Sequence, residues 1–459
     1  MRTISLETMA RLLKGVLKRG YPQKTLNAIN FGKPKYLHAS QAYFYSRSID
    51  WNKQLSAIMQ QKPVAVILPP NIATSYIPKS TAIIQVQDTY QSFWKIALWN
   101  WGYVSPIVVG ITGSAGKSTT TEMVSSILKH RYNMVKTQGN LNTYSFLPSY
   151  LSRLTPKHQV LLLEMGMKSL NNIGKQCAIV KPQYGAITNI GEAHSGSLGG
   201  LDLVVKAKQE LADGIKAGGI LWVNADDTRS RKLNLKRCKG TIKKFGIYNH
   251  ANIRAHRVRY SAKGMTFDLH VGTQKESMFI PTYGIHNVYN ALAACGITLS
   301  MGSTLSDIKK GLASFQMPHM RLQFFKDRSG RTLINDAWNA NPTAMNAGLD
   351  VLKAIAPTQQ GVAVLGDMQE LGDYTTTAHY LVGKHAAKAG LKQLVTIGKY
   401  GRLIATSAIQ NGMKKERVFS YYRHDQVIQH LRKLSAQSVV YFKASRSLYL
   451  EKIVQALRS

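Results

Sequence analysis

Apolar residues follow two alternating patterns along most of the chain: short continuous runs, and longer stretches in which they recur every three or four positions. The runs at residues 107–110, 160–164, 185–189 and 219–224 are typical of buried strands, and helical periodicity fills the stretches between them. Strands that alternate with helices predict a mostly parallel sheet with crossover helices. We predict one such α/β domain over residues 105–316.

Two further α/β domains are predicted to flank this one. A Rossmann-like domain is expected over residues 317–459, with strands at 332–335, 361–366, 394–398 and 439–443 and helices at 343–355 and 377–389. A smaller domain is expected over residues 1–104, where an amphipathic helix pattern around residues 9–17 precedes a proline-bounded strand run at residues 63–69.

Aromatic side chains are concentrated in residues 89–101. Aromatic rings in a basic protein can stack on nucleotide bases. Phe93, Ala97 and Trp101 nevertheless recur at helical spacing, so we favour a helix that packs this stripe between domains.

A strand, a tight turn and a helix are predicted around the sequence Gly-Ile-Thr-Gly-Ser-Ala-Gly-Lys-Ser at residues 110–118. Gly113 and Gly116 let the backbone curl so that its N–H groups and the helix N-terminus converge on one anion. Lys117 can then neutralise phosphate oxygens while the Ser118 hydroxyl reaches a magnesium ion. Because the strict phosphate-loop pattern has one earlier glycine that this chain lacks, a simple Gly/Ser turn with a solvated lysine is the alternative.

Polar side chains follow two predicted strands at the sheet edge where phosphate chemistry takes place. Glu164 ends one strand, Asn189 ends another, and His194 lies five residues further on. A carboxylate and an imidazole that converge there suit a magnesium ion, together with the Ser118 hydroxyl and the nucleotide. Each signal is weak when taken singly, because a glutamate at a strand end is often only a helix cap.

The composition is that of a globular protein of several domains. The chain has 459 residues, more than one core usually holds, and 44% of them are hydrophobic. Cys177, Cys238 and Cys295 are widely spaced and odd in number, which argues against a disulfide framework or a zinc cluster. We also find no signal-peptide pattern and no apolar run of membrane-spanning length, so we expect a soluble, cytoplasmic protein.

The charge is unusual, since 60 lysines and arginines oppose 23 aspartates and glutamates to give a formal net charge of +37. Such a field attracts phosphate-rich substrates, anionic polymers, nucleic acid or an anionic membrane face. A solvated basic surface that serves solubility is the alternative. The sequence has no motif specific for nucleic acid, so the charge indicates an anionic class of partner without naming one.

Further motifs follow the phosphate-loop sequence in a fixed order. They are Gly139-Asn-Leu-Asn142, Glu164-Met-Gly166, Thr188-Asn-Ile-Gly-Glu-Ala-His194, Ala207-Lys208, Gly284-Ile-His-Asn287, Met320-Arg321, Asp336-Ala-Trp-Asn-Ala-Asn-Pro342, Leu365-Gly-Asp-Met-Gln-Glu-Leu-Gly372 and Lys443-Ala-Ser-Arg446. In these motifs and in their order, over about residues 105–450, the chain resembles the Mur ligase family.

The resemblance implies an ATP-dependent amide ligase, with one domain for a carrier-linked acid, a central ATPase domain, and a C-terminal domain that closes over the nucleotide and an amine. In such a ligase a carboxylate takes the γ-phosphate of ATP, and an amine then attacks the acyl phosphate. The implied cofactors are ATP and two magnesium ions. The implied substrates are small molecules: a peptidoglycan precursor or related peptide acid, and an amino acid or dipeptide amine.

The functional positions of the family can be carried over onto this chain. They are Gly113, Ser114, Gly116, Lys117, Ser118, Thr119, His286, Asn287, Asn290, Arg321, Asp336 and Asn339 for the nucleotide, Ser118, Glu164, His194 and Lys208 for magnesium, and Asn142, Asn341, Ser445 and Arg446 for the substrates. Four of them are implied to be catalytic: Lys117, His194, Lys208 and Arg321. The resemblance also implies that Lys208 is carbamylated, which turns an ammonium into an anionic magnesium ligand. Without the resemblance, Lys208 would be interpreted as a surface helix lysine, and the two asparagines at 339 and 341 as turn residues.

Two stretches depart from the family pattern where the acid substrate is expected. Residues 29–44 lack the Asp-Ser-Arg and Pro-Gly motifs of the members that bind UDP, and Thr143 and Phe146 stand where a second asparagine and a glycine usually follow Asn142. Three hypotheses therefore stay open: a peptidoglycan ligase with a divergent first domain, a related ligase of altered specificity, which we slightly favour, and a non-catalytic basic scaffold that binds nucleotide or an anionic polymer.

Overall fold

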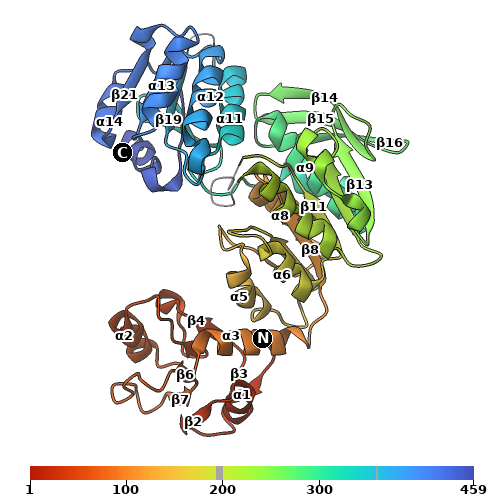
Figure 1. The fold of residues 1–459 in the computed structure, drawn as a ribbon, viewed down its shortest axis with the longest axis vertical. Coiled ribbons are helices and arrows are strands. Elements are labelled where there is room, and N and C mark those ends of the chain that lie inside the picture. The colour runs from red at the N-terminus through yellow and green to blue at the C-terminus, as the bar shows by residue number, and fades with distance from the viewer. Residues whose placement is uncertain (193–199, 358–359) are drawn as a thin grey trace. The chain divides into compact units, whose positions relative to one another are not determined.

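The chain divides into two compact units (Figure 1). The computed structural model describes residues 1–192, 200–357 and 360–459. The first unit comprises Met1–Ile107 and Tyr132–Leu161, and the second comprises Val108–Arg131 and Leu162–Ser459. The domain boundaries predicted after residues 104 and 316 stay predictions.

The first unit is built on a five-stranded sheet of order β2-β7-β6-β5-β4, in which only β2 is antiparallel to its neighbour. The strands of this sheet are β2 (Val16–Arg19), β4 (Ile29–Phe31), β5 (Ala42–Phe44), β6 (Ala65–Leu68) and β7 (Ala82–Gln85), and the unit also contains β1 (Ile4–Ser5), β3 (Thr25–Leu26) and β9 (Met134–Lys136). Its helices are α1 (Leu6–Leu13), α2 (Trp51–Gln61), α3 (Thr89–Trp101) and α5 (Leu147–Leu151). Because strand side chains alternate, one face of the sheet packs on α1 and α3 and the other on α2.

Two predicted helices of this unit can be compared with the structure. Helix α3 has the predicted bounds, with Phe93 and Ala97 buried. The helix expected around residues 9–17 is wrong at its C-terminal end, because Lys14 adopts the left-handed conformation at φ 54° and closes α1. Val16 then begins β2, an edge strand whose apolar positions continue the spacing of the helix.

The second unit contains two sheets, and the phosphate-loop sequence follows a strand of the larger one. Within the second unit the strands of this sheet have the order β16-β15-β14-β13-β12-β11-β8-β10. The pairs β14–β15 and β15–β16 are antiparallel. Its strands are β8 (Ile107–Thr112), β10 (Val160–Glu164), β11 (Tyr184–Ile187), β12 (Ile220–Asn224), β13 (Thr241–Gly246), β14 (Ile253–Ser261), β15 (Gly264–Val271) and β16 (Gln274–Ile280). The predicted parallel strands are confirmed within about two residues, whereas the antiparallel extension was not predicted.

In the described part of the second unit, several helices pack against the larger sheet or against one another. They are α4 (Lys117–Leu128), α6 (Asn172–Val180), α8 (Leu201–Gly214), α9 (Ile285–Ser300) and α10 (Leu305–Ala313). Figure 1 shows α6, α8 and α9 among them. Helix α9 crosses β11 to β14 and contacts α4, while α6 packs on α8. The helix after the phosphate loop is therefore braced by α9, which also carries three of the predicted nucleotide residues.

The smaller sheet of the second unit has the order β17-β18-β22-β19-β20-β21 and is parallel except for β17. Its strands are β17 (Gln323–Lys326), β18 (Thr332–Asn335), β19 (Gly361–Gly366), β20 (Gln393–Ile397), β21 (Val418–Tyr421) and β22 (Val439–Lys443). The helices α11 (Pro342–Ile355), α12 (Thr375–Lys388) and α13 (Gly401–Gln410) cover one face, and α14 (His424–Arg432) and α15 (Glu451–Arg458) cover the other. The predicted Rossmann-like arrangement is confirmed. No helix in the described part of the chain combines the length and apolarity needed to cross a membrane.

Candidate nucleotide site

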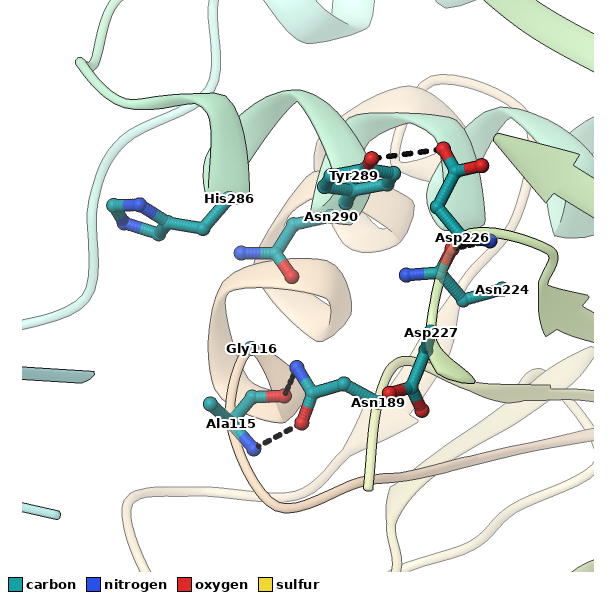
Figure 2. Close-up of a pocket in the computed structure, with 9 residues that line it drawn as sticks. All are labelled: Ala115, Gly116, Asn189, Asn224, Asp226, Asp227, His286, Tyr289 and Asn290. Carbon is teal, nitrogen blue, oxygen red and sulfur yellow. Dashed lines mark hydrogen bonds between the residues drawn. The ribbon is translucent and has the colours of Figure 1, made fainter. Parts of the chain in front are cut away.

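The phosphate loop is the turn at residues 113–116 between β8 and α4. Two side chains that follow β11 hold it from one side. The Thr188 hydroxyl donates to the Ala115 carbonyl at 2.6 Å. The Asn189 amide oxygen accepts from the Ala115 N–H at 2.9 Å (Figure 2). These hydrogen bonds hold the loop in a fixed conformation, so the binding of an anion requires little further ordering of the backbone.

Two glycines are required by the packing of this loop. A Cβ on Gly113 would lie 1.9 Å from the Thr188 hydroxyl oxygen, and a Cβ on Gly116 would lie 2.1 Å from the Asn290 side-chain oxygen. Gly116 is also left-handed at φ 84° where it caps α4. The first N–H groups of α4 have no partner within the helix, so this end suits an anion such as phosphate.

Two cationic side chains lie at the start of α4. The Lys117 ammonium donates to the Gly113 carbonyl at 2.7 Å, and the Arg321 guanidinium donates to the Ser118 hydroxyl at 3.2 Å. Burial lowers the pKa of Lys117, and the Glu164 carboxylate opposes this shift. The residues on either side of Arg321 are left-handed, with φ 57° at Met320 and 42° at Leu322. Such strained backbone is typical of functional segments.

Lys208 and Glu164 are buried beside Lys117. Lys208 lies on α8 and is 1% exposed, and Glu164 ends β10 and is 5% exposed. Burial and the nearby Lys117 charge hold the pKa of Lys208 well below its usual range, while Glu164 opposes them. The alternative that Lys208 is a surface helix lysine is wrong. A buried amine with a lowered pKa is more often unprotonated, which is the state that reacts with carbon dioxide.

A cavity of about 230 Å³ opens beside the phosphate loop (Figure 2). It is lined by Ala115, Gly116, Asn189, Asn224, Asp226, Asp227, His286, Tyr289 and Asn290. The Tyr289 hydroxyl donates to the Asp226 carboxylate at 2.8 Å, and the N–H groups of Ile247 and Asn249 donate to it at 2.6 and 2.7 Å. Burial acts against ionisation, but these hydrogen bonds lower the pKa of Asp226. One wall of the cavity is therefore anionic and rigid.

The three predicted residues of α9 take different positions. His286 and Asn290 line the cavity, whereas Asn287 is buried and donates to the Tyr283 carbonyl at 2.8 Å. Asn290 donates to the Asn287 amide oxygen at 3.0 Å, so Asn287 orients a cavity residue. Burial lowers the pKa of His286 to about 4, although Asp336 opposes the shift. The imidazole is neutral at pH 7 and suits contact with an uncharged base.

Asp336, the first residue after β18, is bonded on both carboxylate oxygens. Lys443 donates to it at 2.6 Å and Tyr441 at 2.9 Å, both from the neighbouring strand β22. Its other oxygen accepts from the Leu322 N–H at 3.3 Å, next to Arg321. Burial lowers the pKa of Lys443 and Asp336 raises it. Besides the predicted nucleotide role, Asp336 therefore holds the segment that carries Arg321.

The predicted asparagines after Asp336 have local partners. Asn341 caps α11, since its side-chain oxygen accepts from the Ala344 N–H at 2.8 Å. Asn339 accepts from the Ala340 N–H at 2.8 Å. Both bonds agree with the alternative interpretation of these asparagines as turn residues. The nucleotide role of Asn339 and the substrate role of Asn341 stay predictions.

Ser445 and Arg446 follow the last strand of the smaller sheet. The Ser445 hydroxyl accepts from the Gln369 N–H at 2.8 Å and so links two loops at the carboxyl edge. Arg446 pairs with Glu451 at 2.6 Å and lies over the Tyr449 ring. Its substrate role stays a prediction.

Four other residues were predicted for the site. Ser114 is buried in the phosphate loop, where its hydroxyl accepts from the Gly191 N–H at 2.8 Å. His194 lies outside the described residues, Thr119 is buried in the first turn of α4, and Asn142 belongs to the first unit. Among the described residues, no group of three or more histidines, cysteines or carboxylates is arranged to hold a metal ion. The Ser118 hydroxyl and the Glu164 carboxylate fit magnesium as oxygen donors, and a bound nucleotide would supply further oxygens.

Several residues that line the cavity or bond to Asp336 were not predicted. Asn224 ends β12 and Asp226 follows two residues later, so both lie at the same carboxyl edge as Glu164. The rule that selected Glu164 could have found them. Tyr289 and Tyr441 carry no such signal, because a tyrosine on a helix or a buried strand resembles any core residue.

Two family descriptions match the chain: "Mur ligase middle domain" over residues 111–298 and "Mur ligase, glutamate ligase domain" over residues 320–446. The UDP-N-acetylmuramoyl-tripeptide–D-alanyl-D-alanine ligase of Bacillus subtilis (strain 168) is 33% identical over 381 residues, which cover 83% of this chain and 82% of that protein. The Escherichia coli (strain K12) protein of the same name is 31% identical over 408 residues, covering 88% and 85%.

Solved structures give the same result for the fold. The crystal structure of MurF from Acinetobacter baumannii superposes with a TM-score of 0.85 at 26% identity and covers 100% of this chain and 99% of that chain. The Thermotoga maritima MurF structure in complex with ADP has a TM-score of 0.79 at 22% identity and covers 94% and 97%. The predicted fold class is confirmed.

Proposed function

Because the chain belongs to the Mur ligase family of ATP-dependent peptide ligases, we propose that it joins the carboxylate of a peptidoglycan-precursor peptide, or a related peptide acid, to the amine of an amino acid or dipeptide. The observation that carries the proposal is the set of buried or partly buried charges around the start of α4. Lys117, Lys208 and Glu164 interact there electrostatically, and Arg321 reaches Ser118.

The relatives suggest the substrates more narrowly. Their names specify UDP-N-acetylmuramoyl-tripeptide as the acid and D-alanyl-D-alanine as the amine. The departures at residues 29–44 and at Thr143 favour a changed acid or carrier. Phe31, within the first of these stretches, stacks on Phe93 at 4.9 Å between ring centroids. An aromatic pair is a poor substitute for charged groups that would meet a diphosphate.

The proposed reaction has two steps. A carboxylate oxygen of the acid attacks the γ-phosphorus of ATP, the bond to the β-γ bridging oxygen breaks, and an acyl phosphate and ADP form. The amine nitrogen then attacks the acyl carbon to give a tetrahedral intermediate. Its collapse expels inorganic phosphate and leaves the amide, while the nitrogen loses a proton to solvent or to a nearby base.

This chain's residues have separable roles in the proposal. The phosphate loop, Lys117 and Arg321 bind and orient phosphate oxygens, and the cavity at Asn290 and Asp226 takes the nucleoside. Ser118, Glu164 and a carbamylated Lys208 would hold magnesium, with His194 as a further predicted ligand. Magnesium would supply charge neutralisation of the transferred phosphoryl group.

The net charge supports a second proposal, which concerns partners. With a net charge of +37, the chain is expected to associate with an anionic polymer or membrane surface in addition to its small-molecule substrates. We also propose that it works in the cytoplasm, where ATP and nucleotide-linked precursors are available.

Phosphate release tests the ligase proposal. With UDP-N-acetylmuramoyl-tripeptide, D-alanyl-D-alanine, ATP and magnesium, release should require both the acid and the amine. Lys117→Ala should lower the rate by at least roughly a hundredfold, because a phosphate-binding charge is lost. The matched control is Lys129→Ala, since Lys129 is an exposed lysine at the other end of α4. ATP turnover that ignores both co-substrates would contradict the ligase proposal.

The same assay separates the two ligase hypotheses. A panel of UDP-linked muropeptides, free peptides, and D- and L-amino acids or dipeptides is offered in all pairs. Release with a UDP-linked acid supports the peptidoglycan ligase with a divergent first domain. Release only with other acids supports altered specificity. Loss of activity in buffers stripped of carbon dioxide, with recovery on adding bicarbonate, would support carbamylation of Lys208.

A further inference from the structure

Residues 1–107 have few acids to balance their positive charge. They contain thirteen lysines and arginines, and their only acidic residues are Glu7, Asp50 and Asp88. The charge is densest around β2, where Lys14, Lys18 and Lys24 are exposed. A surface of this kind attracts an anionic partner, because it has few acidic side chains that would repel one.

Strand β2 is the edge strand of the sheet in the first unit, next to β7 (Figure 1). The pairing register shifts between Leu17 and Arg19, so the strand bends at Lys18. Arg19 then donates to the carbonyl oxygens of Ile77 at 3.1 Å, Pro78 at 2.8 Å and Thr81 at 3.0 Å. This one guanidinium fixes the loop before β7 beside the turn that follows β2.

The turn after β2 is also held firmly. The Leu6 and Glu7 N–H groups of α1 donate to the carbonyl oxygens of Lys24 and Pro22 at 2.9 and 3.0 Å. Gly20, left-handed at φ 122°, passes so close to β7 that a Cβ would lie 2.5 Å from that of Ala82. The side chains presented by this turn and by the loop before β7 are therefore exposed on an ordered backbone.

Tyr21 and Tyr76 are the most exposed large hydrophobic residues of the described chain, apart from one tyrosine at position 248. Tyr21 is 84% exposed on the turn, and Tyr76 is 68% exposed on the loop. Lys18 and Lys24 flank Tyr21, and Lys79 follows Tyr76 by three residues, all exposed. These five residues, Lys18, Tyr21, Lys24, Tyr76 and Lys79, form a basic aromatic edge.

We infer that this basic aromatic edge binds the surface of an anionic lipid bilayer. Each lysine near such a surface gains attraction from the lipid charge, and a tyrosine ring with a polar hydroxyl suits the headgroup layer. The acid near the edge, Glu7, is engaged by the Gln23 side chain at 3.2 Å. The inference deepens the partner proposal and does not depend on the ligase activity.

A bilayer fits this edge better than a nucleic acid does. Single-stranded nucleic acid is bound along a charged groove in which aromatic rings stack on successive bases. Tyr21 and Tyr76 instead stand on two turns with most of their ring surface in solvent. Such residues can enter a headgroup layer without any change in the backbone that carries them.

Vesicle flotation tests the inference with the full-length protein. Vesicles of equal parts phosphatidylglycerol and phosphatidylcholine should bind the protein, and vesicles of phosphatidylcholine alone should not. The variant Lys18→Glu/Lys24→Glu/Lys79→Glu should lose roughly a hundredfold in partitioning, since each lysine contributes about tenfold or less. The variant Tyr21→Ser/Tyr76→Ser should lose about tenfold, because less apolar area enters the interface.

The matched control is Lys414→Glu/Lys415→Glu/Lys433→Glu, which changes the net charge equally at three exposed lysines of the second unit. It should retain binding within about twofold of the unchanged protein. Equal loss in this control, or full binding by either edge variant, would overturn the inference. The inference would also be overturned if an oligonucleotide displaced the protein from the vesicles and if this oligonucleotide bound the edge variants more weakly than the unchanged protein. Thermal unfolding of every variant checks folding, and phosphate release on the same samples separates this result from the ligase proposal.

Discussion

At the scale of single residues, His286 makes the fold sensitive to acid. Burial lowers its pKa to about 4, whereas an unfolded histidine has a pKa of about 6.5. Between these values the unfolded chain binds a proton that the folded chain does not, so stability is complete above pH 6.5 and falls as the pH drops towards 4. The difference amounts to roughly 3 kcal/mol at the acid end.

The variant His286→Gln should remove this part of the acid sensitivity. Urea unfolding at intervals between about pH 4 and pH 7 would then give a flatter dependence than in the unchanged protein, because glutamine does not titrate. His319→Gln, at an exposed histidine, is the control and should leave the slope unchanged. An identical slope in His286→Gln and the unchanged protein would contradict the prediction.

The site residues differ in how far sequence could identify them. Gly113, Gly116 and Lys117 stand in one local motif, so their common position could be predicted from spacing alone. Lys208 could not, because a lysine on an amphipathic helix is usually exposed and only the tertiary structure buries it. Lys208 was predicted as a site residue from the resemblance to the family, and not from the local sequence pattern.

At the scale of elements, the start of α11 depends on Asn341. Its side chain accepts from the Ala344 N–H, and Pro342 occupies the first helical position. Asn341→Ala should lower the free energy of unfolding by about 1 kcal/mol, whereas Asn341→Asp should keep the cap and cost little. Thermal or urea unfolding measures both.

The same two variants address the predicted substrate role of Asn341. If the side chain only caps α11, Asn341→Asp should leave the Michaelis constant for the amine unchanged. A large increase in that constant at unchanged stability would assign a substrate contact to Asn341 in addition to the cap.

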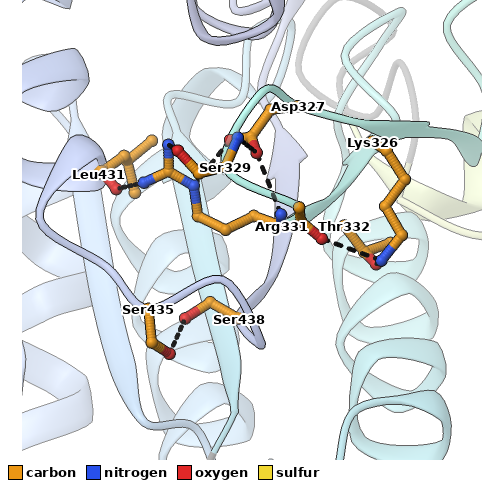
Figure 3. Close-up of polar contacts among 9 residues, drawn as sticks. Lys326, Asp327, Ser329, Arg331, Thr332, Leu431, Ser435 and Ser438 are labelled. Atoms are coloured by element: carbon orange, nitrogen blue, oxygen red, sulfur yellow. Dashed lines mark hydrogen bonds and ion pairs between the residues drawn. The ribbon is translucent and has the colours of Figure 1, made fainter.

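A second element-scale prediction concerns the turn between β17 and β18. Arg331 and Asp327 form an ion pair at 2.6 Å with side-chain exposures of 4% and 0% (Figure 3). Asp327 also accepts from the N–H groups of Ser329 and Arg331, and the guanidinium reaches the Leu431 carbonyl and the Ser329 hydroxyl. The pair thus ties the edge hairpin to α14.

Removing one partner of this pair should be costly. Asp327→Ala leaves a buried guanidinium unpaired and should lower the free energy of unfolding by about 3–5 kcal/mol. Asp327→Leu/Arg331→Met removes both charges and should cost clearly less than Asp327→Ala. Urea unfolding of the three proteins gives the comparison, and a double variant as unstable as Asp327→Ala would contradict the argument.

The elements that sequence predicted well are those with one dominant pattern. The parallel strands at 361–366 and 439–443 are buried on both faces, so their apolar runs are continuous and their bounds are as predicted. Strand β14 is different, because only two of its nine residues are fully buried and three of them are arginines. Its weak alternation, with a register shift after His256, explains why the antiparallel extension was missed.

At the scale of the whole molecule, sequence order does not reveal which segments form one compact unit. Residues 132–161 group with the first unit, although the segments before and after them belong to the second. Such a division follows from contacts between segments that are distant in sequence. The predicted boundaries follow composition and motif positions, which carry no information of this kind.

The net charge of +37 also acts on the molecule as a whole. Like charges repel one another more strongly in the compact state than in the unfolded chain, so the charge destabilises the fold. Salt screens this repulsion, since the Debye length falls from about 30 Å at 0.01 M to about 10 Å at 0.1 M ionic strength. The midpoint of thermal unfolding should therefore rise by a few degrees between these conditions.

The two triple lysine variants make this prediction specific. The triple variant at the basic aromatic edge and the triple variant at Lys414, Lys415 and Lys433 lower the net charge by the same amount. Both should therefore show a smaller rise in the unfolding midpoint with sodium chloride than the unchanged protein does. Sucrose, which adds no ions, should not reproduce the difference between variants. If the midpoint falls with salt, stabilising ion pairs outweigh the repulsion and the argument fails. Equal salt responses combined with unequal vesicle binding would show that stability depends on total charge, while membrane attachment depends on where the charge lies.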